Sequence, residues 1–170
     1  MEKNTQKNPL GLKRIDHIHF YVRDLGEATR RYIKGFNFNI VAKATNGCIG
    51  LPDNVPCHSV VLNQNRIAFV FTQPTGNDNQ IAKHINRHGN GVKDVAFLVE
   101  DVEVALEEAK RRGARVVVPL QTDCSNPRES FRWGSIAAYG DVVHSFVERK
   151  SYKGFAPGYR PELDERDWSS

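Results

Sequence analysis

Two segments of the chain alternate apolar and polar residues in the way that half-buried β-strands do. They are residues 15–22 (IDHIHFYV) and residues 92–99 (VKDVAFLV). Successive side chains of a strand point to opposite faces of its sheet, so the apolar side chains of each segment share one face. In the first segment the other face carries His17, His19 and Tyr21.

Each of these segments is followed by the pattern of a capped helix. Asp24 and Asp101 stand where an N-cap is expected, and Glu27 occupies the capping-box position after the first of them. Apolar residues then recur at helical spacing until Gly35 in one segment and Gly113 in the other. Strand, short turn and helix therefore occur twice in the same order.

A displacement of 77 positions superimposes the two segments, since Phe20 then falls on Phe97 and Asp24 on Asp101. The same displacement brings residues 68–70 of a later strand onto residues 145–147. Each half has room for two more strands, at 39–42 and 58–63 in the first and at 115–118 and 131–138 in the second. The repeat predicts a duplicated βαβββ module, and hence an α+β fold.

The repeat also predicts how the domain is divided and where a pocket forms. We expect one domain over 12–159, with module one at 14–73, a linker at 74–90, module two at 91–150, and flexible ends at 1–11 and 160–170. From residue 150 onward the chain is rich in proline, glycine and charge, which indicates an extended strap or a partly disordered end. Each sheet would cover one face with its helix and leave the other free. Two such sheets side by side would form a cup whose candidate pocket residues are His17, His19, Tyr21, Asp94 and Ser145.

Size and charge exclude several classes of function. A chain of 170 residues with 39% apolar content fits a single domain. The net charge is +4, but the basic residues are scattered and no aromatic residues interleave with them, which speaks against a nucleic-acid partner. No apolar run is long enough to cross a membrane, and the polar N-terminus lacks a signal peptide, so we expect a cytoplasmic protein without a membrane partner. Cys48, Cys57 and Cys124 lack zinc-type spacing and are interpreted as free thiols.

Four segments resemble a known family of oxygenases. They are IDHIHFYV, HGNGVKDVAFLVEDV, YGDVVHSFVERKSYKG and FAPGY, which in this order look like the N-terminal domain of the 4-hydroxyphenylpyruvate dioxygenase and hydroxymandelate synthase family. The wider superfamily is the vicinal-oxygen-chelate, or glyoxalase/bleomycin-resistance, superfamily, built from paired βαβββ modules in a cupped mixed sheet. The resemblance implies iron(II)-dependent oxidation of a 4-hydroxyphenylpyruvate-type keto acid in tyrosine catabolism. It also implies that the iron is held in a second domain, by two histidines and a glutamate.

The positions that hold the metal in this superfamily correspond here to His17 and Asp94 on the first strands of the modules, and to Ala68 and Ser145 on the last. A triad of two histidines and one carboxylate is therefore incomplete, and His17 with Asp94 would hold a metal weakly. A hydrogen bond between these two residues, as a remnant of an ancestral site, is the favoured alternative. Glu148 falls on the opposite face of its strand, where a surface or helix-covered ion pair is expected. We expect no iron to be bound by this chain alone.

A second pair of histidines, His84 and His88, stands four positions apart in the predicted linker helix over 80–88. Such spacing places both rings on one face, where they could chelate a metal. No acidic residue accompanies them in the spacing of a zinc protease, and a solvated pair beside a glycine cap is the favoured interpretation.

Two hypotheses about function follow. In the first, the chain is the N-terminal, non-catalytic domain of a 4-hydroxyphenylpyruvate dioxygenase-like oxidoreductase, as a fragment or a natural single-domain relative, and supports a separate catalytic domain. In the second, it is a stand-alone homodimer that binds or transforms a small anionic aromatic or keto-acid ligand in the cup. Metal analysis together with an activity assay separates the two.

Overall fold

The computed structural model describes residues 8–52, 54–126, 128–162 and 168. The elements of the first module are β1 (Leu12–Tyr21), α1 (Leu25–Phe36), β2 (Asn39–Thr45), β3 (Cys57–Gln64) and β4 (Ile67–Pro74). After α2 (Gln80–His88) come β5 (Gly91–Val99), α3 (Val102–Arg111), β6 (Val116–Asp123), β7 (Ser130–Ala137), β8 (Val143–Lys150) and β9 (Arg160–Pro161). The order βαβββ appears twice, as the repeat predicts, and the α+β fold class is confirmed.

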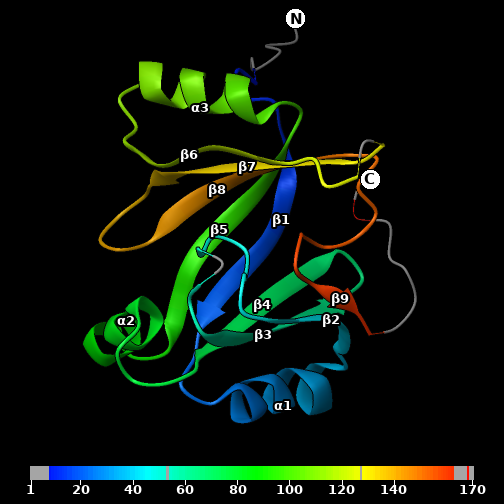
Figure 1. Cartoon of the computed structure of the whole chain (residues 1–170), viewed down its shortest axis with the longest axis vertical. Coiled ribbons are helices and arrows are strands. Elements are labelled where there is room, and N and C mark those ends of the chain that lie inside the picture. The colour runs from blue at the N-terminus through cyan, green and yellow to red at the C-terminus, as the bar shows by residue number, and fades with distance from the viewer. Residues whose placement is uncertain (1–7, 53, 127, 163–167, 169–170) are drawn as a thin grey trace, which may run out of the picture.

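All strands belong to one mixed sheet in the order β6-β7-β8-β5-β1-β4-β3-β2-β9. The two modules meet at its centre, where β1 and β5 pair antiparallel and His19 lies opposite Asp94. Within each module the first strand pairs parallel with the last, β1 with β4 and β5 with β8. Figure 1 shows α1 and α3 at opposite ends of the molecule, each over the sheet of its own module.

Both predicted caps are present. The Asp24 carboxylate accepts a hydrogen bond from the backbone N–H of Glu27 at 2.7 Å, and Asp101 accepts from Glu103 and Val104. The end of α1 differs from the prediction, because the helix continues through Gly35 and ends at Asn37, which adopts the left-handed conformation with φ 57°. Asparagine tolerates this conformation better than most side chains, so it closes the helix in place of the glycine.

Apolar clusters fill both faces of the sheet. One cluster packs beneath α1 around Phe71, and another packs beneath α3 around Leu106. Two more lie on the opposite, cup-side face: one includes Phe155, Ala156 and Trp168 of the C-terminal segment, and the other includes α2 residues. The expectation that this face is free was therefore wrong, because the C-terminal segment and α2 cover it.

The expectation of a flexible end at 160–170 was also wrong for the residues of this range that the structure describes, 160–162 and 168. Arg160–Pro161 form β9 and pair with β2, as Figure 1 shows at the edge of the sheet. The Trp168 ring is buried, with its centroid 4.9 Å from that of Phe155. The burial of these large aromatic rings stabilises the position of the C-terminal segment against the sheet. Residues 1–7, 163–167 and 169–170 lie outside the described part of the chain.

Candidate functional site

The five predicted pocket residues lie on three central strands and are all buried. His17, His19 and Tyr21 come from β1, Asp94 from β5 and Ser145 from β8, and none is more than 6% exposed. The period-two alternation of β1 explains why its three side chains share the cup-side face. The alternation thus predicts the shared face of the three β1 side chains, and all five residues lie in the interior of the protein.

His17 is tied to a buried ion pair. Its Nδ1 lies 2.8 Å from Oδ2 of Asp16, and the Arg149 guanidinium donates to both oxygens of that carboxylate. Burial alone would raise the pKa of Asp16, but the Arg149 charge and the hydrogen bonds from His17 and Arg149 outweigh it, so the pKa lies well below its usual value. Asp16 and Arg149 were not among the predicted site residues, although both are fully buried.

The hydrogen bond expected between His17 and Asp94 is absent. Nδ1 of His17 is used by Asp16, and Nε2 has no hydrogen-bond partner among the described residues. The Phe155 ring packs edge-on against the imidazole, with 5.2 Å between the centroids. His17 is instead bonded to its sequence neighbour Asp16, whose carboxylate is held in place by Arg149.

Asp94 is bonded instead to the last strand of its own module. Its carboxylate accepts hydrogen bonds from the Ser145 backbone N–H at 3.0 Å and from the Ser145 hydroxyl. Ser145 Oγ also lies 2.8 Å from Ser135 Oγ. Burial raises the pKa of Asp94, and the charge of His17 and the bonds from Ser145 only partly offset this effect.

A chain of hydrogen bonds runs from His19 to the C-terminal segment. His19 Nε2 lies 2.7 Å from Thr72 Oγ1, Thr72 lies 2.9 Å from Ser59 Oγ, and Ser59 lies 2.9 Å from the Tyr159 hydroxyl. Burial, with smaller contributions from the positive charges of His17 and Lys93, lowers the pKa of His19 to about 3. The ring is therefore neutral at physiological pH, as is expected for a buried histidine whose hydrogen-bond partner is a hydroxyl and not a carboxylate.

The cup positions do not fit an iron triad. Asp94 is bonded to Ser145, Ala68 offers no donor and Ser145 offers only a hydroxyl, so His17, whose Nε2 is open, has neither a second histidine nor a free carboxylate at the other positions. Glu148 cannot complete the set, because it lies under α3, where it accepts from the Val102 N–H at 2.9 Å and pairs with Arg132 at 3.2 Å. Of the two ion pairs considered for Glu148, one at the surface and one covered by a helix, the structure shows the second.

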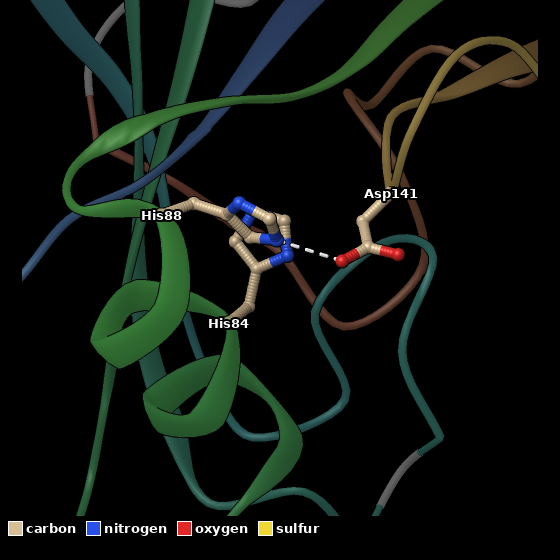
Figure 2. Close-up of side chains that lie close together, drawn as sticks. All are labelled: His84, His88 and Asp141. Carbon is tan, nitrogen blue, oxygen red and sulfur yellow. Dashed lines mark hydrogen bonds and ion pairs between the residues drawn. The ribbon is translucent and has the colours of Figure 1, made fainter.

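A different cluster forms at the rim of the cup, between α2 and the turn that joins β7 to β8. His84 and His88 project from consecutive turns of α2 toward Asp141, as Figure 2 shows. One donor atom from each of the three residues lies within 4.8 Å of the other two. In the described part of the chain this is the one group of three such side chains close enough to share a metal ion.

The spacing favours a solvated pair beside a glycine cap, and His88 is exposed beside Gly89, but the carboxylate of Asp141 joins the pair. His88 Nε2 lies 2.7 Å from Oδ2 of Asp141, and the two rings have centroids 4.7 Å apart. Asp141 is 53 positions from His88, so no local motif could have revealed it. A pocket of about 270 Å³ adjoins the cluster and is lined by Tyr21, Gln80, Lys83, His84, Arg87, Lys93 and Asp141.

Of the three cysteines, Cys48 and Cys57 are buried thiols whose Sγ atoms lie 2.6 Å apart, while Cys124 is exposed. Of the described helices, none combines the length and the apolar character needed to cross a lipid bilayer.

Comparisons with known proteins agree with this architecture. The model of the Glyoxalase/Bleomycin resistance protein/Dioxygenase superfamily matches residues 16–129. The chain is 36% identical over 165 residues to 4-hydroxyphenylpyruvate dioxygenase of Tetrahymena thermophila, covering 93% of this chain and 40% of the relative. It is 37% identical over 149 residues to the enzyme of the same name from Dictyostelium discoideum, covering 85% of this chain and 39% of the relative. The match thus spans about 40% of the length of these relatives, corresponding to their N-terminal domain.

Solved structures show the same fold. A mutant of 4-hydroxymandelate synthase from Streptomyces coelicolor superimposes with a TM-score of 0.69 at 24% identity, covering 81% of this chain and 38% of that one. Methylmalonyl-CoA epimerase from Mycobacterium tuberculosis superimposes with a TM-score of 0.65 at 20% identity, covering 85% of this chain and 93% of that one. The predicted resemblance to the N-terminal domain of the dioxygenase family is confirmed. The chain belongs to the Glyoxalase/Bleomycin resistance protein/Dioxygenase superfamily.

Proposed function

We propose that this chain acts as a non-catalytic domain of the 4-hydroxyphenylpyruvate dioxygenase type, which supports a separate catalytic domain. In that arrangement the catalytic domain would hold iron(II) and oxidise a 4-hydroxyphenylpyruvate-type keto acid in tyrosine catabolism. The chain described here would contribute a rigid packing partner. The proposal includes a cytoplasmic setting, where thiols such as Cys48 and Cys57 stay reduced.

The observation that carries the proposal is the filling of the cup. In single-domain enzymes of such a fold the cup would have to admit a substrate, but here Phe155, Ala156 and Trp168 occupy it as part of an apolar cluster. Arg149 anchors this covering segment by donating to the Phe155 carbonyl at 3.0 and 2.8 Å. A central face that is closed by the chain's own residues favours a structural role over catalysis.

The alternative function, a stand-alone homodimer that binds an anionic aromatic or keto acid in the cup, is supported less well. It depends on His17, His19, Tyr21 and Asp94 reaching a ligand, and all four are buried. The rim pocket carries basic side chains, but it includes Tyr21 alone of the five predicted residues. A ligand in the cup would first have to displace the C-terminal segment.

A chimera tests the proposal. The region of the Tetrahymena thermophila dioxygenase that matches this chain is replaced by this chain, and turnover of 4-hydroxyphenylpyruvate is measured. We expect the chimera to fold and to turn over substrate, and the variant Phe155→Ala to weaken it through loss of domain stability. A chimera that folds and binds iron but is inactive, together with turnover by this chain alone, would contradict the proposal.

A further inference from the structure

We propose that His84, His88 and Asp141 form a binding site for a divalent transition-metal ion of the zinc class. The first support is geometric. Two residues four positions apart on a helix lie on the same face, and here the helix α2 presents both rings to one carboxylate. The donor atoms of the three residues lie within 4.8 Å of one another, so small rotations of the side chains would let a single ion contact all of them.

The chemistry of the donor set selects the kind of ion. Imidazole nitrogens suit zinc, copper, cobalt and nickel, whereas magnesium and calcium prefer sites made of oxygen alone. Two histidines and one carboxylate make three protein ligands, and a tetrahedral ion then keeps one position for water. This set is independent of the incomplete histidine and aspartate positions in the cup.

Metal binding requires unprotonated imidazoles. At His88 the ion would take the place of the hydrogen that the ring shares with Asp141 across 2.7 Å, and any proton displaced would pass to the solvent.

Two positively charged side chains next to the site, Arg87 and Lys93, influence its affinity for a metal ion. Arg87 Nη1 lies 3.4 Å from Oδ2 of Asp141, but its side chain is 74% exposed and can turn toward water. The Lys93 ammonium contacts the backbone carbonyl of Asp141 and stays near the ligands. Both charges repel a bound cation, so we expect that removing Arg87 strengthens metal binding while removing any ligand weakens it. Adventitious binding elsewhere would not show this pair of opposite effects.

A bound ion would also join two parts of the fold. α2 lies between the modules, and Asp141 belongs to the turn between β7 and β8 of the second module. An ion that contacts both would resist their separation, and binding to the folded state raises stability by mass action. Metal should therefore raise the unfolding temperature of the chain.

The test uses the complete chain without a histidine tag, in a Cys124→Ser background that removes the exposed thiol. After removal of metal with a chelator, Zn²⁺ is titrated by calorimetry and Co²⁺ by visible absorption, which reports the coordination number. We expect one ion per chain, and a loss of affinity of about tenfold or more in His84→Gln, His88→Gln and Asp141→Asn, since loss of a ligand should cost at least as much as loss of a residue that orients one. Arg87→Gln should bind more tightly. His58→Gln, at an exposed histidine of β3, serves as the matched control and should bind like the parent.

The proposal is overturned if the parent chain binds neither ion, or if the His84→Gln/His88→Gln double variant binds as the parent does. Because His88 and Asp141 are exposed, these variants should keep the parent's circular dichroism spectrum. Should one of them unfold, the remaining ligand variants and Arg87→Gln still decide the outcome.

Discussion

The molecule contains two groups of histidine and aspartate side chains, one in the cup and one at its rim, and they differ in burial and in their bonding partners. In the cup, His17 and Asp94 are 1% and 6% exposed, and each is bonded to a residue of the protein. At the rim, His88 and Asp141 share one bond with each other and have 42% and 46% of their side-chain surface exposed.

The difference shows that the presence of histidine and aspartate side chains is not sufficient for a metal-binding site. A buried charged carboxylate is costly unless it is paired or hydrogen-bonded, so we expect the bonds of Asp16 and Asp94 to stabilise the fold. Exposed ligands keep their water and can exchange it for an ion. The cup has the shape that is typical of the family, but its buried polar residues are bonded within the protein and stabilise the fold. The side chains of His88 and Asp141 at the rim are exposed and can bind a ligand.

The largest effect that can test this contrast comes from the buried ion pair. Arg149→Met keeps an unbranched apolar side chain but leaves the Asp16 charge uncompensated in the interior and frees the Phe155 carbonyl. We expect the free energy of unfolding in urea to fall by about 3–5 kcal/mol. Arg111→Met, at an exposed pair with Glu108, is the control and should leave the unfolding midpoint unchanged. Similar small effects for both variants would show that the cup network is not structural.

The second effect appears in the pH dependence of stability. His19 has a folded-state pKa of about 3, below the value of ~6.5 for an unfolded chain, so protonation favours unfolding. Its contribution is fully present above pH ~6.5 and is lost as the pH falls toward 3, with a slope of about 1.4 kcal/mol per pH unit between these limits. Urea unfolding of the parent and of His19→Gln at a series of acidic pH values should show a shallower dependence in the variant. Parallel curves would rule out a neutral buried ring.

A smaller effect is expected where the C-terminal segment meets the strands. Tyr159→Phe removes the hydroxyl that bonds Ser59, while Ser59 keeps its bond to Thr72. We expect a loss of about 1 kcal/mol in unfolding free energy. Tyr139→Phe, at a tyrosine that is 74% exposed, should cause no measurable loss. Equal results for the two variants would mean that the segment is not held by this bond.

The smallest effect on stability is expected at the rim. Asp141→Asn removes the charge facing His88 and Arg87, but all three side chains are solvated. The urea midpoint of the metal-free protein should match that of the parent within error, because exposed ion pairs contribute little. A large loss of stability would place the rim cluster in the same structural class as the cup and would remove the contrast.

Sequence patterns predicted the elements of the fold well, because their causes are local. Alternation located β1 and β5, and the caps Asp24 and Asp101 located the helix starts. Alternation could group His17, His19 and Tyr21 on one face, but it could not tell which segment covers that face. The aromatic residues Phe155, Tyr159 and Trp168 of the tail were the available indication.

The missed residues depend on tertiary contacts. Arg149 meets Asp16 across 133 positions, and Asp141 meets His88 across 53, so neither pair lies within a local motif. The rule that a histidine pair needs an acidic residue at a fixed spacing fails here, because the histidines lie on α2 between the modules and the carboxylate belongs to the turn before β8.

The proposal that the cup is a closed interior without iron chemistry is tested most directly by oxygen consumption. The complete chain, with His88→Gln to remove the rim ligand, is mixed with iron(II) and 4-hydroxyphenylpyruvate, and oxygen uptake is compared with an iron blank. The account predicts uptake equal to the blank. Uptake above the blank that disappears in a folded His17→Ala variant would contradict it.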